Sequence, residues 1–207
     1  MATLASFAKY VRPEVPMCPE IQILDAVLRA GIEFCMATKI FQQTVPLTTI
    51  VDEPEYDLTL LMSADSEPDE IIMVQRDFTV NLEPTSQYDA LQLMQTYQSG
   101  TPYWYYLDDR NLHLVLTPNL IETLKVTIKA RPSDDAATLP DVLYRQYVTD
   151  IAAGAKAMLM MQSNQPWTNL DGAAINKSFF DKAIAKENLR YAQGNSRKKM
   201  RTRSHSF

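Results

Sequence analysis

Apolar residues recur with a helical period over the last third of the chain, residues 139–194. One run starts at Leu139-Pro140-Asp141 and continues to about Ser163, and a second run extends over residues 170–191. Pro166-Trp167 interrupts the pattern between them. Two helices of this length joined by a short polar connection predict an antiparallel αα-hairpin.

The first of these runs contains a patch of small residues, Ala152-Ala153-Gly154-Ala155 with Ala157. Small side chains let a neighbouring element approach a helix closely. Packing within the chain and a contact with another subunit both account for such a patch. We favour packing within the chain.

A third helical pattern begins at Pro19-Glu20, where a proline and an acid suit the first turn of a helix. Apolar residues occupy one face of this helix and alternating charges the other, and we expect it to end near Gln43. Residues 1–18 contain two further prolines. Because proline fixes φ and lacks a backbone donor, this segment is predicted to be extended and irregular.

Residues 45–132 change from a helical to a strand-like period. Residues 64–70 are acidic and contain a proline, so we expect a loop there, and a short helix is expected near residues 86–98. β-branched, apolar or alternating runs predict strands at residues 47–51, 71–76 and 124–130.

The clearest local pattern is a pair of apolar runs, residues 103–107 and 112–116. They flank the polar sequence Asp108-Asp109-Arg110-Asn111. Two such runs predict a β-hairpin with a four-residue polar loop.

These elements predict an α+β protein built on a helical bundle. The bundle is expected to comprise residues 19–44 and 133–195, with residues 45–132 inserted as a β-rich region. Residues 1–18 precede it as an extended segment, and residues 196–207 follow as an extended basic arm.

Charge is unevenly distributed along the 207 residues. Residues 196–207 hold five Lys/Arg and no acid, so the net charge of −5 leaves residues 1–195 at −10. The tail has too little apolar surface to fold alone. It can be a solvated end, a nucleic-acid contact or an arm that orders on an acidic protein partner. Phe207 favours the protein partner, since a phosphate contact needs no apolar anchor.

Candidate chemistry is sparse, and we identify no catalytic, cofactor-binding or metal-binding residues. The two histidines, His113 and His205, lack partners at ligand spacing, and the two cysteines form no CxxC motif. Cys35 lies on an apolar helix face, which is typical of a core residue. Five glycines argue against a glycine-rich phosphate loop. We therefore expect no enzymatic activity and no cofactor.

The N-terminal sequence lacks the pattern of a signal peptide. The most apolar window, residues 151–161, is too short to span a bilayer and contains Lys156. We therefore expect a soluble protein that is synthesised in the cytoplasm and does not contact a membrane.

A series of short segments follows one another in order between residues 105 and 184. They are Tyr105-Tyr106-Leu107-Asp108, Leu114-Val115-Leu116-Thr117-Pro118, residues 126–132, Leu139-Pro140-Asp141, Tyr147, residues 151–157, Pro166-Trp167, Phe179-Phe180 and Ile184. This ordered combination resembles the head-to-tail adaptor (connector, or tail tubular A type) proteins of tailed bacteriophages. Residues 52–80 contribute no match.

The resemblance implies a structural virion protein of the neck, between head and tail. Such proteins form a ring, typically dodecameric, that docks under the portal protein, extends the DNA channel and attaches the next tail component (the distal tail or nozzle protein). DNA would pass through without specific binding. Carried over to this sequence, the candidate portal arm comprises Arg197, Lys198, Lys199, Arg201, Arg203 and Phe207. The candidate distal contacts are Asp108, Asp109, Arg110 and Asn111, with the acidic residues 64–70.

Two other functions stay open at this point. Another neck or tail-tube component, such as a tail terminator, would differ in not binding the portal directly. A nucleic-acid-binding accessory protein would use the basic tail, and its DNA affinity would fall steeply with salt.

Overall fold

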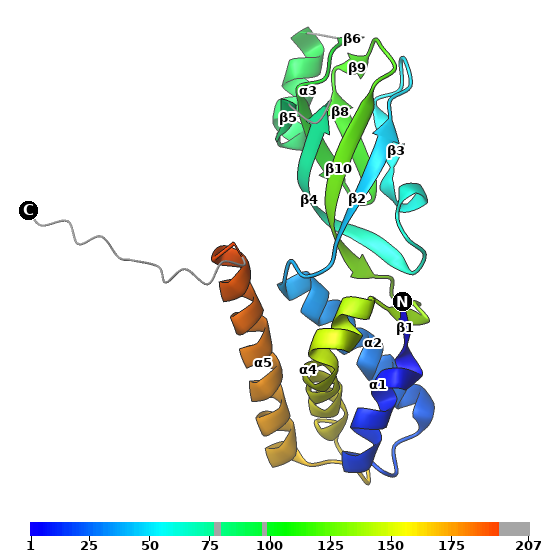
Figure 1. The fold of residues 1–207 in the computed structure, drawn as a ribbon, viewed down its shortest axis with the longest axis vertical. Helices are drawn as coiled ribbons and strands as arrows, with labels where there is room; N and C mark the ends of the chain where they lie inside the picture. The colour runs from blue at the N-terminus through cyan, green and yellow to red at the C-terminus, as the bar shows by residue number, and fades with distance from the viewer. Residues whose placement is uncertain (77–79, 97–98, 195–207) are drawn as a thin grey trace, which may run out of the picture. The chain divides into compact units, whose positions relative to one another are not determined.

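The computed structural model describes all residues except 77–79, 97–98 and 195–207 (Figure 1). It divides into two compact units. We call Met1–Ile40 with Asp141–Phe207 the helical unit, and Phe41–Pro140 the sheet unit. Each unit is described by itself.

The helical unit is built on two long helices that follow each other in the sequence. Its elements are β1 (Ala2–Thr3), α1 (Leu4–Val11), the short 3-10 helix η1 (Arg12–Glu14), α2 (Glu20–Ala37), α4 (Asp141–Met160) and α5 (Leu170–Ala192). The Asn169 side chain caps α5 by accepting a hydrogen bond from the Gly172 amide. The predicted αα-hairpin is confirmed, with α4 and α5 on either side of Pro166-Trp167.

Helix α4 is the centre of the helical unit and contacts α1, α2 and α5 (Figure 1). The patch of small residues makes this packing possible. A Cβ atom built on Gly154 would lie 2.8 Å from the Phe180 ring of α5 and 3.1 Å from Ala30 of α2. The patch therefore packs within the chain, where it lets two helices approach the same turn of α4.

The N-terminal segment differs from the prediction. Residues 4–11 form helix α1, whose Phe7, Ala8 and Val11 side chains are buried. All of the prolines in the first 18 residues come after this helix, so they end it and do not prevent it. The extended segment predicted for residues 1–18 is therefore wrong over most of its length.

The sheet unit contains one large curled sheet and the short helix α3 (Figure 1). Its elements are β2 (Gln42–Thr48), β3 (Glu55–Asp57), the 3-10 helix η2 (Leu58–Leu61), β4 (Ser66–Arg76), β5 (Val80–Pro84), α3 (Gln87–Thr96), β6 (Ser99–Gly100), β7 (Trp104–Asp108), β8 (Asn111–Val115), β9 (Thr117–Pro118), β10 (Thr123–Pro132) and β11 (Thr138–Leu139). The strand order is β2-β10-β4-β5-β7-β8-β3, all antiparallel except for the β5–β7 pair.

The curl of the sheet has a local cause in its longest strand pair. β10 pairs with β4 from Leu124↔Arg76 to Pro132↔Ser66, with register shifts after Thr127 and after Lys129. Such bulges increase the twist of a strand pair and help a sheet to close on itself. The inward side chains form a separate hydrophobic core that includes Val74, Leu114 and Val126.

This architecture overturns the predicted fold class of a helical bundle with an inserted β-rich region. The chain is α+β, and its described residues form five α-helices and a curled seven-stranded mixed sheet that resembles a half-barrel. Its β part is a full unit with its own core. The sequence understated it because β4 begins at Ser66, inside the acidic stretch that predicted a loop.

Element boundaries account for the other differences. The first long helix ends at Ala37, not near Gln43, because residues 42–48 already form β2. The hairpin of β7 and β8 is confirmed, but Asp108 pairs with Asn111, so its turn contains two unpaired residues where four were predicted. The short helix near residues 86–98 is confirmed as α3.

Candidate functional site

The predicted distal contact residues lie at the β7–β8 turn, and two of them are held by other parts of the sheet unit. Arg110 forms an ion pair with Glu67 at 2.9 Å, and the Asn111 amide donates a hydrogen bond to Glu55 at 2.6 Å. Asp108 and Asp109 are exposed, and Asp109 has a positive φ of 51° that fits a tight turn. The turn therefore presents two free-standing carboxylates on a rigid base.

The acidic stretch is a paired strand and not a free loop. Glu67 also binds Arg131 at 2.7 Å, and Asp69 binds Lys129 at 2.6 Å. These carboxylates neutralise cations on the adjacent strand β10, so two of the four acids in residues 64–70 are paired inside the sheet unit. The candidate portal arm, Arg197 to Phe207, lies outside the described residues.

Residues considered for chemistry take structural positions. His113 stacks on the Tyr106 ring at 4.7 Å, with Glu55 at 3.9 Å from its Nε2 atom. Cys35 is fully buried in the helical unit, as its position on an apolar face predicted. Within the described part of the chain, no group of His, Cys, Asp and Glu side chains has the arrangement of a metal site. No described helix is both long and apolar enough to cross a bilayer.

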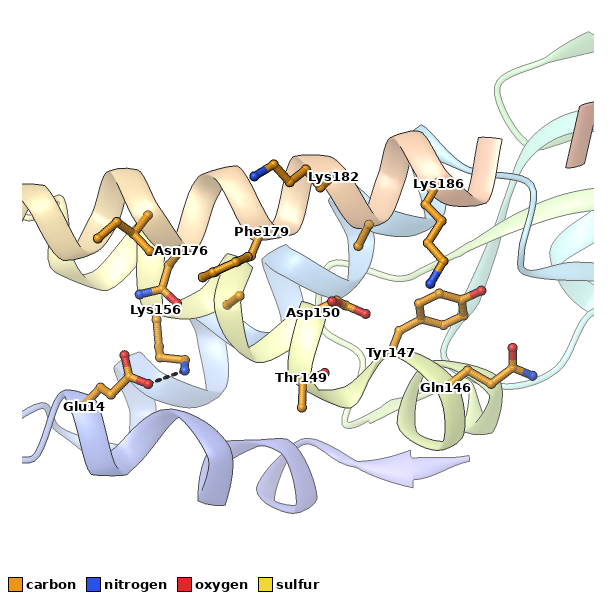
Figure 2. A pocket seen from close by; sticks show the side chains of 13 residues that line it. Glu14, Gln146, Tyr147, Thr149, Asp150, Lys156, Asn176, Phe179, Lys182 and Lys186 are labelled. Carbon is orange, nitrogen blue, oxygen red and sulfur yellow. Dashed lines mark hydrogen bonds and ion pairs between the residues drawn. The ribbon is translucent and has the colours of Figure 1, made fainter. Parts of the chain in front are cut away.

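A groove of about 620 Å³ lies on the helical unit, and we call it the α4/α5 groove (Figure 2). α4 forms its floor, α5 forms one wall and η1 contributes Glu14 at one end. Figure 2 shows the Phe179 ring directed from α5 toward α4. The lining residues that carry the argument below are Asp150, Ala153, Ile175, Phe179, Lys182 and Lys186.

The groove joins exposed apolar surface to positive charge. Ile175 and Phe179 lie one helical turn apart on α5 and are 57% and 55% exposed. Lys156 is neutralised by Glu14 at 2.6 Å. Burial raises the pKa of Asp150, and the ammonium of Lys186 opposes that rise. Large apolar side chains exposed side by side in a concave surface are typical of a contact with another macromolecule.

One end of the groove is fixed by a buried hydrogen bond between the two long helices. The Tyr147 hydroxyl of α4 donates to the Glu187 carboxylate of α5, and Arg190 lies 3.7 Å from that carboxylate. Tyr147 also interrupts the helical dihedral angles of α4, with φ −130° and ψ 17°. The bond therefore ties α5 to α4 at the point where α4 is irregular.

This bond makes a prediction about alkaline pH. Burial and the hydrogen bond to Glu187 raise the pKa of Tyr147 to about 12, against about 10 for a tyrosine in an unfolded chain. The stability that follows from this shift is fully present below about pH 10 and is lost as the pH rises toward 12. We expect the stability difference between wild type and Tyr147→Phe to shrink over that window.

The measurement is urea unfolding of both chains at a series of pH values from neutral to alkaline. Tyr88→Phe removes an exposed hydroxyl from the sheet unit and is the control for the change in stability that follows the loss of any tyrosine hydroxyl. A wild-type minus Tyr147→Phe difference that stays constant with pH would contradict the assignment.

Sequence reasoning did not identify the groove. The sequence places Phe179 and Ile175 in a helical period, and Phe179-Phe180 is also one of the segments of the family resemblance, but neither pattern indicates a groove. The available signal was that the apolar residues of α5 do not share one face: Phe180 is fully buried while its neighbour Phe179 is exposed. A helix that packs on one side needs only one apolar stripe, so a second stripe indicates a second contact.

The helical unit carries an exposed apolar groove and the sheet unit carries a charged turn, and both features are typical of a protein that works through contacts with other macromolecules. The comparison with known families gives this class a specific identity. A family model described as SU10 adaptor protein matches residues 2–203, nearly the whole chain. No curated protein matches the sequence significantly.

The chain belongs to the SU10 adaptor protein family, a family of phage head-to-tail adaptors. The resemblance stated from the sequence is thereby confirmed. The family is structural, and its members are components of the virion neck that associate with other parts of the phage head and tail.

Proposed function

We propose that copies of this chain form a ring that docks under the portal protein, extends the DNA channel and attaches the next tail component. The observation that carries the proposal is the α4/α5 groove, an exposed apolar surface on a chain of an adaptor family. A ring subunit needs such a surface, because it must contact a neighbour through two different patches.

The basic tail supports contact with the portal. Its cations and terminal aromatic ring, in a segment without acids, fit an acidic protein surface with an apolar pocket. The residues proposed for this arm are Arg197, Lys198, Lys199, Arg201, Arg203 and Phe207.

Contact with the distal tail component is proposed for the β7–β8 turn. Asp108 and Asp109 are exposed acidic members of the predicted set, while Arg110, which is also exposed, and Asn111 contact Glu67 and Glu55. A turn braced in this way presents its carboxylates without losing further conformational freedom on binding.

Net negative charge supports passage of DNA without adhesion. Residues 1–195 carry a net charge of −10, and an acidic surface repels phosphates. A basic channel face in the assembled ring would contradict this part of the proposal.

The arm is tested by co-sedimentation with purified portal rings of the same phage. We expect the full chain to sediment with the rings and a chain lacking residues 196–207 to stay in solution. Two full-length variants separate the contributions: one replaces the five basic residues with Gln, and the other is Phe207→Ala. Weaker binding in both would support an arm that uses charge together with an apolar anchor.

The same samples distinguish the nucleic-acid alternative. That function predicts binding of duplex DNA that weakens steeply with salt and is lost with residues 196–207. Tail-dependent DNA binding without portal binding would overturn the portal arm and favour the accessory protein.

A further inference from the structure

The helical unit has a second exposed apolar feature, on helix α2. Met17, just before this helix, and Ile21, in its first turn, are 72% and 77% exposed. Asp25 and Arg29 follow Ile21 at four-residue intervals and form an exposed ion pair at 3.0 Å. We call Met17, Ile21, Asp25 and Arg29 the α2 stripe.

The α2 stripe and the α4/α5 groove lie on opposite faces of the helical unit. α2 turns Ala30 and Phe34 toward its neighbours, where Phe34 contacts Tyr147 of α4 at 4.9 Å between ring centroids. Ile21, Asp25 and Arg29 are exposed on α2, since they lie about 100° to 180° around the helix from those buried residues. The groove is formed by the side of α4 that α2 does not cover (Figure 2).

The two surfaces match in length. The α4 residues of the groove extend from Gln146 to Lys156, which is about 15 Å of helix at 1.5 Å per residue. Ile21 and Arg29 are separated by about 12 Å along α2 on the same measure. The apolar residues of the stripe, Met17 and Ile21, can therefore contact Ile175 and Phe179. The charged residues Asp25 and Arg29 then lie within the same groove.

They also match in charge. The groove presents the ammonium groups of Lys182 and Lys186, with the carboxylate of Asp150 between the helices. The stripe presents Asp25 beside Arg29. Their mutual ion pair is exposed, and exposed pairs contribute little to the stability of the isolated chain. Asp25 and Arg29 can therefore give up this ion pair and form ion pairs with another chain at little cost in free energy.

We propose that the occupant of the α4/α5 groove is the α2 stripe of a second copy of this chain. Ile21 packs against Ile175 and Phe179, Asp25 faces the two lysines and Arg29 faces Asp150. Because groove and stripe lie on opposite faces, each copy leaves one surface free for the next copy, as a closed ring requires. The inference rests on the proposed function in assuming that copies associate, and it assigns the surfaces they use.

The test is cross-linking between two full-length variants, Gln22→Cys at an exposed position next to the stripe residue Ile21 and Ala183→Cys in the groove wall, mixed in equal amounts with a short bismaleimide. We expect a covalent dimer of twice the 23.5 kDa chain mass in the mixture and not in either variant alone. Wild type with the reagent gives the background from Cys18 and Cys35, which are buried.

Disruption of each surface provides the second arm. Ile21→Asp added to the Gln22→Cys chain, or Phe179→Asp added to the Ala183→Cys chain, is expected to abolish the dimer. Leu60→Asp in either chain is the matched control, since Leu60 is 82% exposed on the sheet unit and should leave the dimer unchanged.

Three results would overturn the interface: no dimer above background, equal cross-linking of Ala183→Cys with Leu60→Cys, or a dimer that survives Phe179→Asp. Dimers within a single variant would indicate a two-fold contact and would also overturn it. Portal binding is read separately by co-sedimentation. A cross-link without portal binding would support the interface and contradict the portal role. Portal binding without a cross-link would contradict the interface alone.

Discussion

Replacing Arg76 with methionine is expected to cost about 3–5 kcal/mol of stability in the sheet unit, because it strands a buried carboxylate. Arg76 is only 9% exposed, and its Nε atom lies 2.5 Å from Oε2 of Glu122, with both atoms shielded from solvent. The guanidinium also donates to the Pro102 carbonyl and lies 5.5 Å from the centre of the Tyr103 ring. It therefore ties the end of β4 to the segments that precede β7 and β10.

The measurement uses the position of the two tryptophans. Trp104 belongs to the sheet unit and Trp167 to the helical unit, so a Trp167→Phe background reports unfolding of the sheet unit alone. We expect the urea midpoint of the Trp104 signal to fall in Arg76→Met. The double variant Arg76→Met/Glu122→Leu removes both charges and should be more stable than Arg76→Met. A double variant that is less stable would contradict the explanation.

A valine at position 154 is expected to destabilise the helical unit by about 3 kcal/mol through overpacking. The Cβ atom alone would lie 2.8 Å from two ring atoms of Phe180, which is fully buried and has no room to move away. A branched side chain adds two further carbon atoms to the same space. Gly154→Ala should cost less, since better helix propensity returns about 1 kcal/mol.

Urea unfolding followed by Trp167 in a Trp104→Phe background measures this effect. Ala174→Val, an exposed position on α5, is the matched control for introducing valine into a helix and should change the midpoint little. Equal midpoints for Gly154→Val and Ala174→Val would show that α2 and α5 do not approach α4 as closely as described.

The helices were the more predictable part of the fold, because their apolar residues repeat over many turns. The periodicity from Asp141 to Ala192 predicted α4 and α5 almost to their ends. The size of the sheet unit was underestimated because its longest strand, β4, contains acidic residues that are typical of a loop. Glu67 and Asp69 look like loop residues in the sequence, yet their carboxylates bind Arg131 and Lys129 on the adjacent strand. Such pairing becomes visible only once the register is known.

The candidate site was harder to predict than the fold. Asp108 and Asp109 stand out in the sequence as a polar turn, and the structure leaves both exposed. The α4/α5 groove, by contrast, depends on which of two adjacent phenylalanines faces the core. Phe179 and Phe180 are chemically identical, and only the packing of α5 against Gly154 buries the second and exposes the first.

The central claim is that this chain is a phage adaptor that assembles on the portal, and native mass measurement tests it most directly. The purified chain is measured alone and after mixing with portal rings of the same phage. We predict a portal complex heavier than the portal ring by a whole multiple of the 23.5 kDa chain mass. A portal ring whose mass is unchanged at saturating chain concentration would contradict the claim.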